Sequence, residues 1–568
     1  IFRMSDLKTI EYSTDFCVVG GGIAGLCAAL AAARHGLKTV LVHDRPIPGG
    51  NASSEIRMWI CGARGKDNRE TGIVEELMLE NFYQNPGLKY AVWDSVLYEK
   101  ALLEPNLTLL LNTSCFEAKT ENGRIKSIKA WQSNAETFHV VEAEYFADCS
   151  GDSILAPLSG ADFMLGREAE ADFNESIGPI ERDNKTMGMS CLFQIRETMQ
   201  KQSFTPPTWA YQYLTDEDLP HKGHNIESNF WWIEIGGEGD CLHDTDQCRD
   251  ELLKIAYGVW DHMKNHGDHG VDNWELEWIG FLPGKRESRR YKGKHIITQN
   301  DVQSGGRFED IVAYGGWPLD DHFPAGFYYS AGPLAVDHPA PSPWGIPLRS
   351  LYSSNIENLV FAGRNISATH AAMSSSRVMA TCGLMGQAIG TAVAMAVTAN
   401  TTLEKINIVD LQQKLMDDDC YIPWHERKVP KLTQSARCSA EVIRNGVERG
   451  EENCWVGKAG DVIEYTFEKP QQISAIRLVF DSDLNRKYQN MPCNFPLEQN
   501  RFKLPQTLTK EYKIIGTAKD GKEYIIHETH CHQRLVKHRV DWEVVSVKLC
   551  PLSTWGEEKF KVFGFEVR

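Results

Sequence analysis

Near its start the chain reads Phe16-Cys17-Val18-Val19-Gly20-Gly21-Gly22-Ile23-Ala24-Gly25. The four apolar residues predict a buried strand, and the Ala-rich segment after the glycines predicts a helix that runs to about His35. Gly36 then provides a helix stop, and a second apolar run at Thr39–Val42 completes a βαβ unit. Strands that alternate with helices in this way predict an α/β fold with a parallel sheet and right-handed crossovers.

Three glycines, Gly20, Gly22 and Gly25, fit the fingerprint of a dinucleotide-binding turn. The first permits a tight turn, the second lets a pyrophosphate approach the backbone, and the third lets the helix pack closely against the strand. The N-terminus of that helix offers free N–H groups and a positive dipole end to phosphates. The sequence therefore predicts a Rossmann-like dinucleotide-binding domain.

An acidic ligand for the ribose is expected about 20 residues further on, at the end of the second strand. That position holds His43, and Asp44 comes one place later. Either His43 bonds the ribose hydroxyls or Asp44 turns back to do so. A surface His-Asp-Arg turn that ends with Arg45 is the alternative.

The composition is typical of a soluble globular protein, with 568 residues, 42% hydrophobic and 24% charged, and a net charge of −17. At about 100–200 residues per domain, this length predicts about three domains. The acidic balance argues against a nucleic-acid partner and against an anionic membrane surface. A charge-free run at residues 378–402 consists mainly of Ala, Gly, Thr and Met, so we expect a helix packed inside the protein there, not a membrane span.

Fifteen cysteines are spread along the chain without any Cys-x-x-Cys pair. This spacing disfavours a zinc ribbon, a redox dithiol and a haem attachment site, and it favours reduced, buried thiols. Residues 1–6 contain no basic-then-apolar leader, but the chain does not begin with Met. The compartment therefore stays open between the cytoplasm and a periplasm reached after removal of a leader.

Changes in composition divide the chain into segments. A Trp-rich region with short polar loops interrupts the βα pattern, and a hairpin is expected from residues 107–112 and 125–131 around an Asn122-Gly123 turn. Short alternating runs near the C-terminus predict a β-sandwich. The expected units are a dinucleotide-binding domain at 14–171 and 285–402, an inserted α+β substrate or cap domain at 172–284, a connector at 403–430 and a β-sandwich at 431–568.

Several further motifs occur in a fixed order along residues 14–400. They are Val19-Gly20-Gly21-Gly22, residues 44–57 (DRPIPGGNASSEIR), residues 147–152 (ADCSGD), residues 346–351 (IPLRSL), residues 358–370 (NLVFAGRNISATH), residues 376–379 (SRVM) and residues 386–388 (GQA). Through these motifs the chain resembles the FAD-dependent oxidoreductases of the glutathione-reductase-like superfamily, in a branch often found in bacteria that degrade glycans. The resemblance does not extend to the last domain.

The resemblance implies FAD as the cofactor and a set of residues around it. It places the loop after the second strand beneath the flavin, the Gly151-Asp152 turn over the pyrophosphate and ribityl chain, and the helix start at Val378 near the flavin N1/O2 edge. A helix N-terminus there would stabilise negative charge on the ring. The cofactor-binding residues expected in this way are Gly20, Gly22, Gly25, His43, Asp44, Arg45, Gly50, Asn51, Ser53, Ser54, Gly151, Asp152, Gly363, Arg364, Arg377 and Val378.

Removal of a hydride from a carbinol requires a base that takes the hydroxyl proton, and a neutral histidine has a suitable pKa. His370 is the first choice because it lies in the motif next to the flavin, with a packed or capping histidine as the alternative. Glu55 and Arg57 follow the flavin loop and are expected to bind or orient the substrate, unless they form surface ion pairs. His322 and His338 are weaker candidates in an aromatic, Pro-rich stretch.

Two other constellations carry less weight. The segment His527-Glu528-Thr529-His530-Cys531-His532 is dense in metal-capable side chains, but it lacks the helical His-Glu-x-x-His spacing and lies beside an expected strand. The run at residues 285–290 (KRESRR) is short and mixed in sign, so a solvated face or a substrate-anchoring loop is expected there. No metal site is expected.

Residues 457–467 and 473–478 resemble a discoidin-like, galactose-binding-like sandwich, a fold that binds sugars in some proteins and only packs against a neighbour in others. Together with the Trp-rich cap, this favours an FAD-dependent oxidoreductase that transfers hydride between flavin N5 and a polar small molecule, such as a carbohydrate or its derivative. The absence of Cys-x-x-Cys argues against disulfide reduction. The alternative is a non-catalytic or weakly redox-active glycan-binding protein on the same fold, and the oligomeric state stays open.

Overall fold

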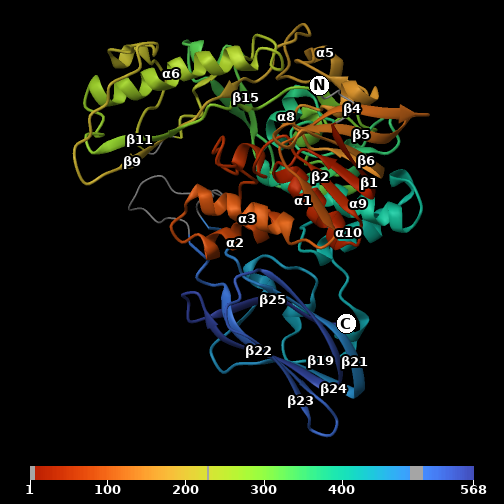
Figure 1. Ribbon diagram of the computed structural model, residues 1–568. Coiled ribbons are helices and arrows are strands. Elements are labelled where there is room, and N and C mark those ends of the chain that lie inside the picture. The colour runs from red at the N-terminus through yellow and green to blue at the C-terminus, as the bar shows by residue number, and fades with distance from the viewer. Residues whose placement is uncertain (1–6, 227–228, 487–502) are drawn as a thin grey trace.

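The computed structural model describes residues 7–226, 229–486 and 503–568. Residues 1–6, on which the expectation about a leader rests, lie outside this described part. Three bodies are visible in Figure 1: an α/β body that carries α1 (Ile23–Arg34), a cap beside it that carries α6 (Thr245–Asn265), and a C-terminal body of long strands below them. Each body has its own cluster of buried hydrophobic side chains.

The α/β body contains the predicted parallel sheet. Strand β1 pairs with β2 on one side and with β6 on the other, and β3 extends the sheet beyond β2. The chain leaves this sheet for some 200 residues and then returns, because β18 pairs in parallel with the last residues of β6. The strands are β1 (Lys8–Val19), β2 (Thr39–Val42), β3 (Leu107–Leu110), β6 (Thr137–Asp148) and β18 (Leu359–Phe361).

The expected hairpin was wrong in one of its two strands. Leu107–Leu110 is β3 of the parallel sheet, and the hairpin forms instead between β4 (Thr113–Glu121) and β5 (Arg124–Gln132). The turn between them was right: Asn122 and Gly123 have φ angles of 52° and 71°, the positive values of a type I′ turn. Strand β4 gives a weak sequence signal because most of its side chains are exposed or half-buried.

Helix α9 (Met379–Thr398) explains the charge-free run. It is the one helix in the described part that is long and apolar enough to cross a membrane, yet 89% of its most apolar window is buried inside the protein. It packs against α1 so closely that a Cβ on Gly386 would lie 2.0 Å from the carbonyl oxygen of Ala24. A Cβ on Gly390 would lie 2.3 Å from the carbonyl oxygen of Ala28. Its small residues therefore serve helix packing in the core.

The cap is an α+β unit, as expected. Helix α6 packs with two small antiparallel sheets, β10-β8-β12 and β11-β9, around buried aromatic side chains such as Phe193 and Trp260. Leu334, from the segment that the sequence assigned to the dinucleotide-binding domain, also packs in this core. The strands are β8 (Met189–Ser190), β9 (Phe193–Glu197), β10 (Glu234–Ile235), β11 (Trp274–Ile279) and β12 (Gly284–Lys285).

The C-terminal body is the expected antiparallel β-sandwich. Two long strands, β21 (Ile463–Phe480) and β24 (Leu535–Thr554), pair with each other, and bulges bend them around a shared core. The strands β22 (Thr509–Thr517), β23 (Glu523–Glu528) and β25 (Phe560–Val567) complete most of the sheet.

The β-sandwich is joined to the α/β body by side-chain contacts. Arg534 pairs with the buried carboxylate of Asp419 at 3.0 Å. His532 stacks on Tyr83 with ring centroids 3.9 Å apart, and its Nε2 lies 3.2 Å from Glu80. The histidine-rich segment at residues 527–532 thus uses one of its rings in this interface.

Candidate active site

A cavity of about 1420 Å³ lies where the parallel strands end and the cap begins. Its lining includes residues at the carboxyl ends of the strands, as is usual for ligand sites in α/β sheets. Pockets for drug-sized ligands occupy about 300–1,000 Å³, so this cavity has room for more than one such ligand. One end is formed by the glycine turn, and the other by Trp59, Arg64, Trp231, Trp317, Asp320 and His322.

The glycine turn has the geometry that a bound pyrophosphate requires. Gly20 has φ +100°, and a Cβ there would lie 2.4 Å from the backbone of Ser150. A Cβ on Gly25 would lie 1.8 Å from the carbonyl oxygen of Gly20, so this glycine permits close packing of helix and turn. Gly22, in contrast, faces the cavity: its nearest neighbour for a Cβ is Gly50 at 3.9 Å. Bare backbone and the N-terminus of α1 are thus presented to a phosphate.

At the end of β2, His43 lines the cavity, but both of its ring nitrogens contact backbone groups. The Gly21 N–H donates to Nδ1 of His43 at 2.9 Å, and Nε2 of His43 donates to the carbonyl of Ile47 at 2.9 Å. Burial lowers the pKa of His43 to about 4, so the ring is neutral in this tautomer. Because backbone groups contact both ring nitrogens, the His43 side chain supports the conformation of the glycine turn.

Its two neighbours remain available to a ligand. Asp44 lines the cavity with a side chain that is 62% exposed. Arg45 also lines the cavity, and its Nη1 is buried without a hydrogen-bond partner. A buried guanidinium nitrogen without an acceptor is costly, and an anionic or hydroxyl-bearing ligand in the cavity would satisfy it.

The Gly151-Asp152 turn is held by charged side chains. Asp152 accepts from Arg364 at 2.7 Å and from Ser288 at 2.8 Å, and it pairs with Lys285 at 3.0 Å. Although burial favours the protonated carboxyl, the charges of Arg364 and Lys285 hold the pKa of Asp152 well below its usual range. This turn and Gly363 line the cavity next to the glycine turn.

Some residues of the loop after β2 line the cavity, and others form hydrogen bonds within the protein. Gly50 and Asn51 line the cavity. Ser53 donates to the carbonyl of Gly50 at 2.8 Å, and the Ser54 N–H donates to Asp94 at 3.0 Å, so both shape the loop.

Glu55 and Arg57 do not lie in the cavity lining of the described residues. The Arg57 guanidinium lies between the rings of Tyr90 and Trp278 at 4.5 and 4.3 Å, and it donates to Gln194 at 2.6 Å. Burial raises the pKa of the Glu55 carboxyl, which lies 3.5 Å from the Ser53 hydroxyl. Since neither side chain lines this cavity, their expected role in binding or orienting the substrate stays a prediction.

His370 also lies outside the cavity lining. Its Nδ1 is 2.8 Å from Glu287 and its Nε2 is 3.0 Å from Asp321. Although burial alone would lower it, the charges of Glu287 and Asp321 raise the pKa of His370 to about 10. A raised pKa favours the protonated ring, and both ring nitrogens already have partners, so this geometry does not favour His370 as the base, and its catalytic role stays a prediction.

The run at residues 285–290 is mostly buried, and it is not a solvated face. Arg286, Glu287 and Arg290 are 6%, 1% and 0% exposed. Arg290 pairs with Glu168 at 3.0 Å, and Glu287 pairs with His370. Glu287 and Arg290 thus belong to the buried network around His370, while Lys285 and Arg286 line the cavity.

Of the histidines considered as a base, His322 lines the cavity. Its Nδ1 lies 2.7 Å from Glu234, a fully buried carboxylate, which fixes the ring and keeps a proton on Nδ1. Its Nε2 lies 3.1 Å from Nη2 of Arg377, a donor, and 3.2 Å from Oδ1 of Asp320, an acceptor. The ring has a partner at Nε2 in both protonation states: neutral it accepts from Arg377, and protonated it donates to Asp320.

The electrostatics around His322 favour the protonated ring. Burial alone would lower the pKa of His322, but the charge of Glu234 and the hydrogen bond to Asp320 raise it above its usual value. Arg377 is held against Asp320 at 2.9 Å, and the pKa of Asp320 is well below its usual range in spite of burial.

Strand alternation explains why neighbouring residues have opposite roles here. In β15 (Leu319–His322), Asp320 and His322 point into the cavity, while Asp321 between them points to His370. Sequence reasoning named His322 only as a weaker candidate and missed Asp320 and Glu234, whereas Arg286 belongs to the run for which a substrate-anchoring loop was one of two expectations. A strand at Asp320-Asp321-His322 would have placed Asp320 and His322 on the same face, but no strand was predicted there.

Aromatic and charged side chains form the wall around His322. The rings of Trp231 and His322 are 5.3 Å apart. The Arg64 guanidinium lies 4.3 Å over the Trp317 ring and pairs with Asp337 at 3.2 Å. Most tryptophans of the cap are in its core or at its edges, so only Trp231 and Trp232 of that group line the cavity. The wall therefore combines flat apolar faces with carboxylates and guanidinium groups.

A parallel sheet, a phosphate-binding glycine turn and a cavity that continues into a polar pocket define a dinucleotide-dependent enzyme. The chain belongs to the family of FAD dependent oxidoreductases, whose match covers residues 15–415. FAD is therefore its cofactor. The unsatisfied Arg45 nitrogen, the open backbone of Gly22 and the cavity volume show that the residues present fit this group.

Individual relatives match over shorter stretches or at low identity. A glycerol-3-phosphate dehydrogenase of Mycobacterium leprae is 39% identical over 66 residues, 12% of this chain and 11% of that protein. Among solved structures, a geranylgeranyl bacteriochlorophyll reductase-like protein of Thermoplasma acidophilum is 12% identical, covers 72% of this chain and 85% of that chain, and has a TM-score of 0.32. A family 32 carbohydrate-binding module from Streptococcus pneumoniae is 9% identical, covers 24% of this chain and 97% of that chain, and has a TM-score of 0.19.

Proposed function

We propose that this FAD-dependent oxidoreductase oxidises an alcohol group of a carbohydrate or a carbohydrate derivative. The observation that carries the proposal is the constellation at His322, which combines a proton acceptor with a wall of indole rings and hydrogen-bonding groups in one cavity with the glycine turn. Indole faces pack against the C–H faces of sugars, while carboxylates and guanidinium groups bond their hydroxyls.

The cofactor would be held mainly by backbone and by a few charged groups. We assign the pyrophosphate to Gly22 and the N-terminus of α1, and the ribose to Asp44 and Arg45. The ribityl and isoalloxazine portions are assigned to Gly50, Asn51, Gly151, Asp152, Gly363, Arg364, Arg377 and Val378, which line the cavity between the turn and the polar pocket. When bound, FAD supplies a hydride acceptor at its isoalloxazine ring.

The proton of the substrate hydroxyl is taken, in this proposal, by Nε2 of neutral His322. Glu234 holds the ring orientation and stabilises the imidazolium that forms. Asp320 then accepts a hydrogen bond from the new Nε2–H, and Arg377 is released from that nitrogen to bond the substrate oxygen. His370 has a positioning role, because it anchors β15 through Asp321.

An anaerobic visible spectrum of the purified protein tests the proposal. A panel of neutral sugars, amino sugars and sugar acids is added one at a time, with glycerol 3-phosphate as a small non-sugar comparison. Bleaching of the flavin bands by a sugar compound and not by glycerol 3-phosphate is the expected result. Bleaching by glycerol 3-phosphate alone would contradict the substrate class, and a protein that neither contains nor takes up FAD would favour a glycan-binding role.

A further inference from the structure

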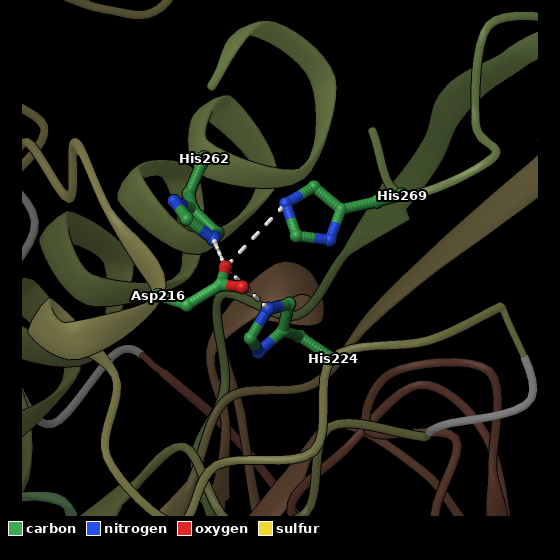
Figure 2. Close-up of side chains that lie close together, drawn as sticks. All are labelled: Asp216, His224, His262 and His269. Atoms are coloured by element: carbon green, nitrogen blue, oxygen red, sulfur yellow. Dashed lines mark hydrogen bonds and ion pairs between the residues drawn. The ribbon is translucent and has the colours of Figure 1, made fainter. Parts of the chain in front are cut away.

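Four side chains of the cap converge at a place away from the cavity. Asp216, His224, His262 and His269 each offer one possible ligand atom, and these atoms all lie within 4.8 Å of one another. Figure 2 shows the three imidazole rings arranged around the Asp216 carboxylate. They come from different segments: a short 3₁₀ turn at residues 216–218, the loop that follows it, helix α6 and the loop after α6.

The distances suit a tetrahedral ion. Ligand atoms about 2.0 Å from a zinc ion at tetrahedral angles lie about 3.3 Å from one another. Oδ1 of Asp216 lies 3.0 Å from Nε2 of His262, 3.5 Å from Nε2 of His224 and 3.8 Å from Nε2 of His269. Small side-chain rotations would therefore bring the four atoms to coordination distance.

Two of the histidines are held in the tautomer that a metal requires. Nδ1 of His262 lies 2.9 Å from the carbonyl oxygen of Tyr213, and Nδ1 of His224 lies 2.7 Å from that of Lys222. A carbonyl oxygen accepts only, so each Nδ1 carries the proton and each Nε2 keeps a free lone pair directed at the cluster. Carbonyl partners of this kind orient histidine ligands in metal sites.

The third histidine has a competing contact. Nε2 of His269 lies 3.2 Å from the carbonyl oxygen of His266. Coordination through Nε2 would replace this contact, and its length makes it the weakest hydrogen bond made by these three rings to the backbone. The ring centroids of His262 and His269 are 4.8 Å apart, and that of His224 lies 5.0 and 4.9 Å from them.

We propose that Asp216, His224, His262 and His269 form a zinc site. Three neutral imidazoles and one carboxylate are a nitrogen-rich donor set of the kind that zinc prefers, and four protein ligands leave no open position for a substrate. The site has a structural role. His262 is fully buried on α6, whereas Asp216 is 74% exposed, so the ion would join the surface turn to the helix.

The turn that the ion holds leads directly into the active-site wall. His221 and Gly223, in the segment between Asp216 and His224, line the large cavity, and Trp232 donates its indole N–H to the carbonyl of Gly223 at 2.7 Å. Zinc binding would thus order one wall of the substrate end without touching the substrate. This inference stands on the cap residues alone and does not depend on the identity of the substrate.

Metal analysis of purified variants tests the site. The FAD-loaded protein is dialysed against metal-free buffer, supplied with one equivalent of ZnCl₂, gel-filtered and analysed for zinc by plasma mass spectrometry. Asp216→Asn keeps the shape of an exposed side chain, and His269→Gln changes a loop residue, so neither should prevent folding; circular dichroism and flavin content verify this. The control is His243→Gln, because His243 is an exposed cap histidine that pairs with Asp240 at 2.8 Å outside the cluster.

We expect one zinc per chain in the wild type and in His243→Gln, and a zinc affinity lower by at least about tenfold in Asp216→Asn and His269→Gln, since even indirect partners of ligands contribute that much. Zinc should also raise the midpoint of thermal unfolding in the wild type and not in these two variants. The proposal is overturned if the wild type binds zinc no more tightly than the two cluster variants. It is equally overturned if His243→Gln loses as much zinc as they do.

Discussion

The two ends of the large cavity are built in different ways. At the glycine turn, backbone atoms of consecutive residues line the cavity, and the lack of side chains at Gly20, Gly22 and Gly25 allows this close arrangement. At the other end, the groups around His322 are side chains from β10, β15 and the residue after α8 (His370–Ser376). A site made of backbone atoms can be recognised from one short sequence motif. A site made of side chains depends on residues that are distant in sequence and that only the fold brings together.

The two ends also differ in how charge is held. Around the glycine turn, a helix N-terminus and a single unsatisfied guanidinium face the cavity. Around His322, the carboxylates of Glu234 and Asp320 and the guanidinium groups of Arg286 and Arg377 form mutual pairs. The first end can accept an anion, while the second can move a proton without creating an unpaired charge. The following changes separate these two roles.

The largest effect is expected at the cofactor end, from Gly25→Val. A Cβ at this position would lie 1.8 Å from the carbonyl oxygen of Gly20, so the turn must open and the pyrophosphate site is lost. We expect protein purified without FAD, measured as the ratio of flavin to protein absorbance. Gly332→Ala is the matched control, because nothing lies within 4 Å of a Cβ there. Full flavin content in Gly25→Val would show that the turn does not hold the cofactor.

The next effect distinguishes the two buried histidines. His322→Gln should lower kcat by about 10²–10⁴-fold, the usual contribution of a general base, with normal flavin content. His370→Gln should lower kcat by less than about tenfold, because His370 acts only through Asp321. Steady-state kinetics with the sugar identified in the anaerobic panel measures both. A larger loss of kcat in His370→Gln than in His322→Gln would indicate that His370 is the base.

Sequence reasoning identified one end of the cavity much better than the other. The βαβ unit, the glycine turn, the inserted cap and the β-sandwich follow from local patterns, because periodicity and glycine spacing act within a few residues. The sequence could not distinguish His370 from His322, because burial and pairing decide which imidazole is available. Glu287 and Asp321, which pair with the two ring nitrogens of His370, are 83 and 49 residues away from it in sequence. No local pattern encodes such contacts.

A smaller effect concerns stability and its pH dependence at His370. Its pKa is raised to about 10 in the folded protein, above an unfolded value of about 6.5. The stabilisation is therefore fully present below pH 6.5 or so and is lost as the pH rises through 10. His370→Gln should lower the free energy of unfolding by about 3 kcal/mol near pH 6, and the difference should narrow toward pH 10.

Denaturant unfolding of wild type and His370→Gln at several pH values measures this difference. Because the variant removes the imidazolium that pairs with Glu287 and Asp321, its deficit should be largest at low pH, where the charged ring contributes fully to stability. A deficit that stays constant or grows between pH 6 and pH 10 would mean that His370 is neutral in the folded protein.

The smallest effect is expected from Arg45→Gln. Nη1 of Arg45 is buried without a partner, so a ligand in the cavity would satisfy it. Loss of one such contact should weaken FAD binding by about tenfold, or about 1.4 kcal/mol, with the fold unchanged. Titration of the apoprotein with FAD, followed by fluorescence quenching, measures it. An unchanged dissociation constant would place the cofactor away from the end of β2.

The pH dependence of anaerobic flavin reduction tests the central claim most directly. With a substrate from the sugar panel, the reduction rate of the wild type should rise with pH through a single inflection above 6.5, because neutral His322 is the proton acceptor and its pKa is raised. His370→Gln should keep this inflection, and His322→Gln should lose it along with most of the rate. An inflection that persists in His322→Gln would contradict the account and assign the proton to another group.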